Sequence, residues 1–320
     1  MGRTIVVVAL MLVAAGALWM TQPVFFVRKA ADAGPVPDPA RLARRVRTLV
    51  EDYFPRDGGH PQNMARAALW IAGELRHAGA AVLEQPFDTA GDRYSNVVAA
   101  FGPPTKDVVV VGAHYDAAGE KPGADDNASG VAALLELADL LSGVSFARRV
   151  ELVAFANEEA PYFATPGMGS EVYARSLEES HRRVRGMICL EMLGCFTDDP
   201  DSQKLPFRLL HLFYPSKGDF IAVVGSLGRP GIVRSVKRAM MAASDLPVYS
   251  IDAPRWVPGV DLSDHSTFWR RGDPAVMITD TAFYRNPRYH TAQDTPDTLD
   301  YERMAKVVAG LRRSVLALAR

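Results

Sequence analysis

The sequence has few cysteines, almost no net charge and no internal repeat. Its 320 residues include only two cysteines, Cys189 and Cys195, so a zinc site built from four thiolates is excluded. The two thiols could pair in an exported protein or remain free and buried. The 36 Lys and Arg residues nearly balance the 37 Asp and Glu residues, which gives a net charge of -1. This balance lacks the broad basic field that nucleic-acid binding requires, so we expect no nucleic-acid partner.

The longest uncharged apolar run lies at the amino terminus. Residues 4 to 20, TIVVVALMLVAAGALWM, carry no charge, and residues 23 to 27 extend the apolar run. This pattern is typical of a signal anchor or a signal peptide. The Ala14-Ala15-Gly16-Ala17 cluster could be cleaved. The run is nevertheless long for a signal peptide and lacks a clear A-x-A site near its end, which favours an uncleaved anchor over a secreted product. We expect the anchor or signal peptide at 1–27, a Pro-rich tether at 28–39 and an exported globular domain at 40–320.

The globular part alternates between strand and helix patterns, and 48% of the whole chain is hydrophobic. Apolar residues at helical spacing predict two helices between residues 42 and 75. The patterns further on predict strands at 81–88, 95–101, 107–114, 149–157, 184–193, 220–226, 248–252 and 275–280. Helices are predicted between them at 129–142, 169–179, 231–243 and 264–271, and a last helix at 299–319. Such alternation indicates an α/β fold, a single domain with a mostly parallel, twisted central sheet covered by helices on both faces.

Residues 107 to 130, DVVVVGAHYDAAGEKPGADDNASG, join a buried strand to a helix through a loop rich in polar side chains. Four consecutive valines predict a strand inside a parallel sheet, and open α/β sheets bind ligands at the carboxyl ends of such strands. His114 and Asp116 are two residues apart, so on a strand they share one face. An imidazole can then bind a metal while the carboxylate fixes its tautomer.

Further candidate ligands follow other apolar strands. Glu158 and Glu159 come directly after one strand, where adjacent side chains point in opposite directions, so one can bind metal while the other faces the bound water. Glu191 is the lone charge in an apolar strand, and a buried carboxylate is costly unless it is paired or coordinated. His290 lies in a turn-rich segment near the carboxyl terminus. The alternative for Glu158 and Glu159 is a solvated acidic strand end, and the alternative for Glu191 is a structural salt bridge.

Together these residues form a set of nitrogen and oxygen donors that suits catalytic zinc. The expected metal ligands are His114, Asp125, Glu159, Glu191 and His290. Five ligands are too many for one tetrahedral zinc ion and about right for two ions that share Asp125. Three carboxylates and a bridging hydroxide also balance the four positive charges of two zinc ions.

Six motifs, in order, resemble those of the co-catalytic di-zinc exopeptidases, a family that includes bacterial zinc aminopeptidases, glutamate carboxypeptidases and glutaminyl cyclases. They are GAHYDA, PGADDNASGVAALLELA, FANEEA, LEMLG, SDHSTF and YHTAQDTPDTLDY, spread over about residues 95 to 300. The resemblance implies a zinc peptidase domain, most simply an aminopeptidase, that hydrolyses peptides or small amides. It also implies that Asp125 bridges two zinc ions, each held by one imidazole and one terminal carboxylate, and that the Asp125–Asp126 bond is cis.

The resemblance also implies catalytic roles. Glu158 is similar to the general base that takes a proton from water and passes it to the leaving amine, and Tyr289 to a phenol that stabilises the oxyanion. Asp264 and His265 resemble a segment that lines the site without binding metal. One departure is Glu191, because many family members have Asp there and the extra methylene changes the reach of the carboxylate.

Three other functions compete with this interpretation. A glutaminyl cyclase would use one zinc ion, and a non-catalytic ectodomain would lack a ligand or the base, whereas this sequence keeps both His residues and the complete GADDNASG segment. The motif that could support nucleotide binding is GSLGRPG at 225 to 231, but its glycine spacing is not that of the dinucleotide fingerprint. The loops at 195–219 and 253–263 follow strands and are expected to determine specificity.

Overall fold

A computed structural model of the chain describes residues 2–25, 27–29 and 34–320. Its centre is one eight-stranded sheet with the order β1-β2-β4-β3-β5-β8-β6-β7. The strands are β1 (Ala81–Thr89), β2 (Asp92–Phe101), β3 (Asp107–His114), β4 (Arg149–Phe155), β5 (Arg183–Glu191), β6 (Ile221–Ser226), β7 (Val248–Ala253) and β8 (Ala275–Thr279).

Four parallel strands, β4, β3, β5 and β8, form the middle of the sheet. On one side of them β2 runs antiparallel to β4 and forms a hairpin with β1. On the other side β6 runs antiparallel to β8 and parallel to β7. The predicted mostly parallel sheet is therefore confirmed, and the functional consequence is that the carboxyl ends of four neighbouring strands meet at one edge.

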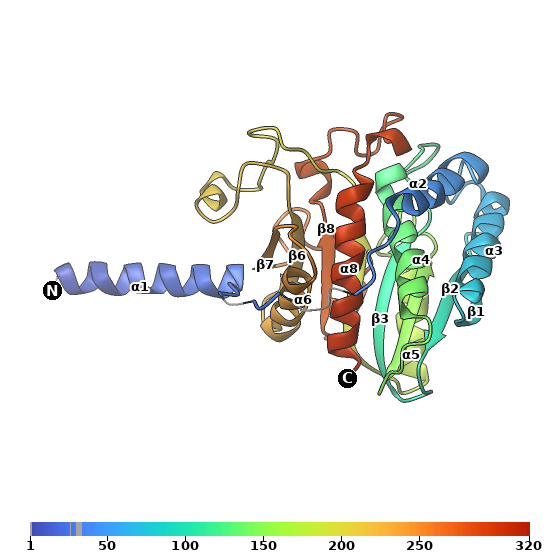
Figure 1. Cartoon of the computed structure of the whole chain (residues 1–320), viewed down its shortest axis with the longest axis horizontal. Coiled ribbons are helices and arrows are strands. Elements are labelled where there is room, and N and C mark those ends of the chain that lie inside the picture. The colour runs from blue at the N-terminus through green and yellow to red at the C-terminus, as the bar shows by residue number, and fades with distance from the viewer. Residues whose placement is uncertain (1, 26, 30–33) are drawn as a thin grey trace.

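Helices cover both faces of the sheet, as predicted (Figure 1). The side chains of β3 alternate, so Val109 and Val111 pack on one face while Val108 and Val110 pack on the other. The first face is covered by α2 (Pro39–Arg47), α3 (Pro61–His77), α4 (Gly130–Leu141), α6 (Pro230–Ala243) and α8 (Tyr301–Leu318). The second face is covered by α5 (Gly169–Glu179) and α7 (His265–Arg270).

Short helical turns occupy several connections. They are η1 (Thr48–Asp52), η2 (Ala124–Ser129), η3 (Arg208–Leu212), η4 (Ala282–Tyr284) and η5 (Pro296–Thr298). The turn η2 lies between β3 and α4, at the point where the sequence changes from buried valines to the ADDNAS segment. It therefore brings polar side chains to the carboxyl edge of the sheet.

The amino-terminal segment forms α1 (Gly2–Thr21), which projects away from the sheet (Figure 1). Residues Thr4–Thr21 are long and apolar enough to cross a membrane, and a signal sequence would have the same properties. Part of the predicted tether, residues 30–33, lies outside the described residues, as do residues 1 and 26 of the predicted anchor or signal peptide. Both cysteines are free and buried, so the pairing considered above does not form.

Candidate metal centre

The candidate ligands come together at the carboxyl edge of the four parallel strands. His114 is the last residue of β3, Glu191 is the last residue of β5, and Glu158 and Glu159 follow β4. His290 lies in the loop between η4 and η5, after β8. Residues separated by more than 170 positions in the sequence therefore meet because parallel strands place their ends side by side.

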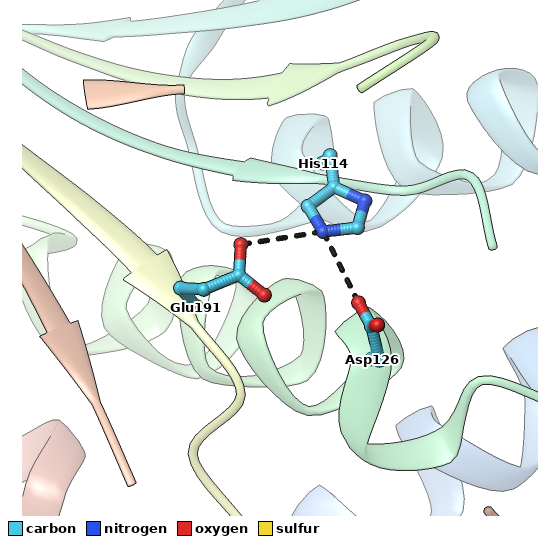
Figure 2. A group of neighbouring side chains, drawn as sticks. All are labelled: His114, Asp126 and Glu191. Carbon is cyan, nitrogen blue, oxygen red and sulfur yellow. Dashed lines mark ion pairs between the residues drawn. The ribbon is translucent and has the colours of Figure 1, made fainter. Parts of the chain in front are cut away.

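The first of two donor groups contains His114, Asp126 and Glu191 (Figure 2). The Nε2 atom of His114 lies 3.4 Å from Asp126 Oδ1 and 3.4 Å from Glu191 Oε2. Figure 2 shows both carboxylates pointing at this nitrogen from η2 and from the end of β5. Ser263 donates a hydrogen bond of 2.6 Å to Glu191 Oε2 and so holds the longer glutamate side chain in place.

The second group contains Asp126, Glu159 and His290. The Nε2 atom of His290 lies 3.0 Å from Asp126 Oδ2 and 3.1 Å from Glu159 Oε1. Within each group the candidate ligand atoms all lie within 4.8 Å of one another. The two oxygens of Asp126 therefore face different imidazoles, which is the arrangement of a carboxylate shared by two sites.

This geometry corrects the expected position of the shared carboxylate by one residue, from Asp125 to Asp126. Asp125 points the other way, because its Oδ1 accepts a hydrogen bond from the Gly194 amide and its Oδ2 accepts one from Asn286 Nδ2. The backbone leaves the helical conformation at Asp126 (φ -104°, ψ 89°), so the two neighbouring side chains diverge. The cis peptide bond is likewise one position later than expected, between Asp126 and Asn127.

Two side chains and a glycine determine the conformation of the loop that presents Asp126. The carboxylate of Asp294 accepts hydrogen bonds from the amides of Asp125 and Asp126, at 2.9 and 3.1 Å. The fully buried Arg56 donates to the carbonyls of Tyr115, Pro122 and Gly123. Gly123 has φ +57°, and a Cβ atom there would lie 2.3 Å from the carbonyl oxygen of Asp126. Only glycine fits this turn.

Asp116 connects the first imidazole to the two glutamates after β4. Its carboxylate lies 3.5 Å from His114 Nδ1 and accepts hydrogen bonds from the amides of Glu158 and Glu159, at 3.0 and 2.9 Å. The His114 ring nitrogen also lies 3.2 Å from the Asp116 carbonyl oxygen. Asp116 therefore orients both the imidazole and the loop that carries Glu158, whose Oε2 lies 3.9 Å from His114 Nε2.

The buried carboxylates strongly affect one another. Burial raises the pKa of Glu158 well above its ordinary range, and burial together with the charge of Asp126 raises the pKa of Glu159 to about 7. Burial alone would lower the pKa of His114, but Glu191 and Glu158 raise it well above its ordinary value. Ionising these carboxyls together would therefore accumulate negative charge in a space from which water is largely excluded.

A divalent cation would relieve this accumulation of charge. His114 Nε2 is buried and has no hydrogen-bond partner among the described residues, although two carboxylates point at it. The donors of the two groups are imidazole nitrogens and carboxylate oxygens, the set that suits catalytic zinc. The residues present therefore fit metal ions at both groups.

Other predicted residues border the two groups. The ring of Tyr289 stacks on that of His290, with centroids 3.8 Å apart. Asp264 is fully buried beside the site, and burial raises its pKa to about 7. His265 Nε2 lies 2.8 Å from the Val260 carbonyl oxygen, and its ring meets Trp269 edge-on. Neither Asp264 nor His265 belongs to the two donor groups.

Several supporting residues were not predicted from the sequence. Arg56, Ser263 and Asn286 carry no signal in their local sequence, because their partners lie far away in the chain. Asp294 did carry one, since it is a carboxylate close to His290 in the sequence, but its two amide partners are about 170 residues distant. A third buried cluster of Asp125, Cys195 and Asp280 lies beside the site.

A largely apolar pocket opens next to Glu191 and Tyr289. Its floor includes Tyr249 and Ile251 of β7, and its walls come from the two loops after β5 and β7. The residues contributed by these loops are Gln203, Lys204, Leu205, Pro206, Leu210 and Tyr214, and Val257, Pro258, Gly259, Val260 and Leu262. Both loops expected to determine specificity thus line one pocket at the donor groups.

Two related proteins each match most of this chain in sequence. A protein of Escherichia coli K12, named YfbL and described as uncharacterized, is 45% identical over 281 residues, which are 85% of this chain and 86% of that protein. Leucine aminopeptidase 1 of Coccidioides posadasii is 24% identical over 251 residues, and the match spans 74% of this chain and 58% of the fungal protein.

Two solved structures share the fold. A zinc aminopeptidase from Bacillus subtilis superposes with a TM-score of 0.69 at 17% identity, covering 88% of this chain and 95% of that one. A glutaminyl cyclase from Bacteroides thetaiotaomicron superposes with a TM-score of 0.67 at 20% identity, covering 88% and 99% of the two chains. The model of peptidase family M28 matches residues 96–315, a range that contains both donor groups. The expected family is thus confirmed, and the chain belongs to peptidase family M28.

Proposed function

We propose that this peptidase is a zinc-dependent aminopeptidase with two metal ions. One ion would be held by His114, Asp126 and Glu191, and the other by His290, Glu159 and Asp126. The observation that carries the proposal is the position of Asp126, whose two oxygens lie 3.4 and 3.0 Å from the two imidazoles. Of the five ligands expected from the sequence, four keep their proposed roles and Asp126 replaces Asp125.

The proposed mechanism is hydrolysis of a peptide bond by water. Zinc, when bound, supplies the Lewis acidity that makes a water proton easier to remove near neutral pH and polarises a carbonyl group. Glu158 lies beside the first donor group and would accept the proton from water, then deliver it to the leaving amine. Burial, followed by nearby carboxylates, raises the pKa of Tyr289, so its phenol stays protonated and can donate to an oxyanion.

The proposed substrate is a peptide or small amide whose terminal side chain is apolar. The pocket beside Glu191 and Tyr289 offers aromatic and aliphatic walls, which suit an apolar side chain. The fungal relative is a leucine aminopeptidase, which supports removal of an apolar residue from the amino end. A glutaminyl cyclase with one metal ion is the alternative, because a protein of that activity shares the fold.

We also propose that α1 is retained as a membrane anchor and that the peptidase domain is exported. The support is the apolar, exposed segment Thr4–Thr21, which is long enough to cross a membrane. Protease should digest an extracellular domain on intact cells, and a periplasmic domain once any outer membrane has been removed from cells that are not lysed. A domain that is digested only after the cells are lysed would contradict export.

The test of the activity combines a metal count with substrate profiling. Elemental analysis of zinc-loaded protein should find two zinc ions per chain, and aminoacyl reporters should be cleaved faster than carboxyl-terminal reporters. A chelator should abolish cleavage. A single zinc ion together with cyclisation of an amino-terminal glutamine would replace the proposal with the cyclase, and two zinc ions without any cleavage would reject both.

A further inference from the structure

Two loops beside the pocket expose large apolar side chains to solvent. The loop around η3 exposes Phe207, Leu209, Leu212 and Phe213, and the loop after β7 exposes Trp256, which is 75% accessible. Single exposed apolar residues are common on soluble proteins, but a group of them marks a surface that contacts something else. Because both loops line the same pocket, we call these five side chains the apolar rim of that pocket.

The apolar rim lies at the end of the sheet from which α1 departs. Ser250 of β7 donates a hydrogen bond of 2.6 Å to the carbonyl of Thr21, the last residue of α1. Lys237 of α6 lies 3.4 Å from the carbonyl oxygens of both Thr21 and Gln22. The last residue of the helix therefore contacts the outermost strand directly, and Ser250 and its neighbours in β7 line the pocket.

Figure 1 shows the η3 loop extending from the domain toward the side on which α1 leaves it. If the helix enters a bilayer, its fixed attachment to β7 holds this end of the domain at the bilayer surface. Leu, Phe and Trp side chains at such a surface bury apolar area at the boundary between headgroups and acyl chains. The direction of α1 and the position of the apolar rim therefore both indicate that the bilayer is the partner of this surface.

Basic side chains surround the start of the tether. A hollow beside α6 is lined by Val27 and Gly231 together with Arg28, Arg234, Arg238, Arg313 and Arg320, and no acidic residue is among its described lining residues. Lys29 adds a further positive charge and donates to the carbonyls of Met241 and Ser244. Clusters of this kind next to a membrane helix attract anionic headgroups. A lipid surface suits this combination of charge and apolar rim.

We propose that the peptidase domain docks on the bilayer that α1 enters, with Leu209, Leu212 and Trp256 at the level of the lipid headgroups. The pocket beside the metal groups then opens along the membrane surface. The proposal rests on the retention of α1 as an anchor, which is part of the proposed function, but not on the peptidase activity.

The test uses the depth of a fluorescent label on the full chain. Both native thiols are buried, so Leu209→Cys provides a single reactive thiol for an environment-sensitive dye. Leu83→Cys is the matched control, because Leu83 is 65% exposed against 71% for Leu209 and lies on β1, at the opposite end of the sheet. Both labelled proteins are placed in nanodiscs of phosphatidylcholine and phosphatidylglycerol, and circular dichroism verifies their fold.

We expect a nitroxide-labelled lipid to quench the dye at position 209 strongly and the dye at position 83 little. Aqueous iodide should show the opposite order, with several-fold weaker quenching at position 209. Equal iodide quenching at both positions would overturn the docking. Protection from iodide without lipid quenching would also overturn it, because protein then covers the loop. A chain that does not join the nanodiscs would contradict the anchor itself and the docking with it.

Discussion

Asp125 and Asp126 are chemically identical neighbours in opposite environments. Asp126 faces two imidazoles, whereas Asp125 is held by the Gly194 amide and the Asn286 side chain. We therefore expect Asp126→Asn to lose bound zinc and at least about 100-fold in activity, since a metal ligand matters at least as much as the groups that orient it. Asp125→Asn should retain its zinc, as elemental analysis of the purified variants can measure. If Asp125→Asn lost its zinc and Asp126→Asn kept it, the prediction made from the sequence, that Asp125 is the shared ligand, would be correct.

Glu158 is the residue whose loss should separate chemistry from metal binding. It lies 3.9 Å from His114 but belongs to neither donor group. Glu158→Gln should lower kcat by about 10² to 10⁴ while zinc content stays unchanged, because a general base contributes about that much to rate. Glu179→Gln, at the exposed end of α5, is a control that should leave kcat unaltered. Loss of zinc in Glu158→Gln would instead indicate that Glu158 is a metal ligand.

Asp252 makes stability depend on pH away from the active site. It is 1% exposed, neither carboxylate oxygen has a hydrogen-bond partner among the described residues, and burial raises its pKa to about 7. The carboxyl of the unfolded chain titrates near about 3.9, so between about pH 4 and pH 7 the folded state binds more protons. The free energy of unfolding therefore falls as pH rises through this window.

Asp252→Asn should remove that contribution. The stability advantage of the variant over the wild type should grow by on the order of a few kcal/mol between about pH 4 and pH 7. Chemical denaturation of the full chain in detergent at several pH values measures it. A difference between the two proteins that stays constant with pH would show that Asp252 is not protonated in this window.

At the residue scale the sequence predicts which residues gather but not how each is oriented. His114, Glu159, Glu191 and His290 lie together as expected, because each is the polar residue at the end of an apolar strand or in the loop that closes the site. The choice between two adjacent aspartates depends on the φ and ψ angles of η2, and no periodic pattern encodes these. The roles of Glu158 and Tyr289 remain predictions.

Among the elements, α2 is held to α4 by a buried ion cluster. Glu136 of α4 has a fully buried side chain and contacts Arg41 at 2.6 Å and Arg45 at 2.7 Å. Removing one partner of a buried pair leaves charges without compensation. Glu136→Ala should therefore lower the free energy of unfolding by about 3 to 5 kcal/mol, measured by denaturant titration.

The exposed ion pair between Glu84 and Arg76 provides the control for this variant. Its atoms are 3.1 Å apart, and the side chains of Arg76 and Glu84 are 51% and 36% exposed. Glu84→Ala should cost about 0 to 1 kcal/mol. Equal losses in the two variants would show that the α2–α4 cluster contributes no more than a surface pair.

The predicted elements agree closely with the structure. Each predicted strand from β1 to β8 has a counterpart, half of the strand ends coincide, and the others differ by at most three residues. The buried valines of β3 and the apolar face of α4 carry strong periodic signals, which explains this agreement. The ion cluster between α2 and α4 was missed because about 90 residues separate its members.

For the whole molecule, the order of the strands could not be read from the sequence. One parallel neighbour of β5 is β8, which begins more than 80 residues later in the sequence. The strands β6 and β7 lie between β5 and β8 in the sequence, but in the sheet they lie on the far side of β8. This order places β7 at the edge and brings the loops after β5 and β7 together around one pocket. The alternation of strands and helices along the sequence predicts the fold class, whereas the pairing of strands that are distant in the sequence determines the shape of the pocket.

Metal removal should affect the whole molecule, since two imidazoles and three carboxylates from different elements would share the ions. Zinc-loaded protein should be inactivated by a chelator, and its Tm should fall, because a ligand present at 100 times its Kd stabilises the folded state by about 2.7 kcal/mol. Differential scanning calorimetry with and without zinc measures the shift. An unchanged Tm would mean that the donor groups do not bind zinc tightly.

The two free thiols have a consequence for where the protein can mature. Cys189 is buried in β5 and Cys195 follows it, with no covalent link between them. Burial raises the pKa of both thiols, which keeps them protonated and poorly reactive. Folding thus requires neither an oxidant nor a disulfide isomerase, and the native state should form equally well in reducing and in oxidising surroundings.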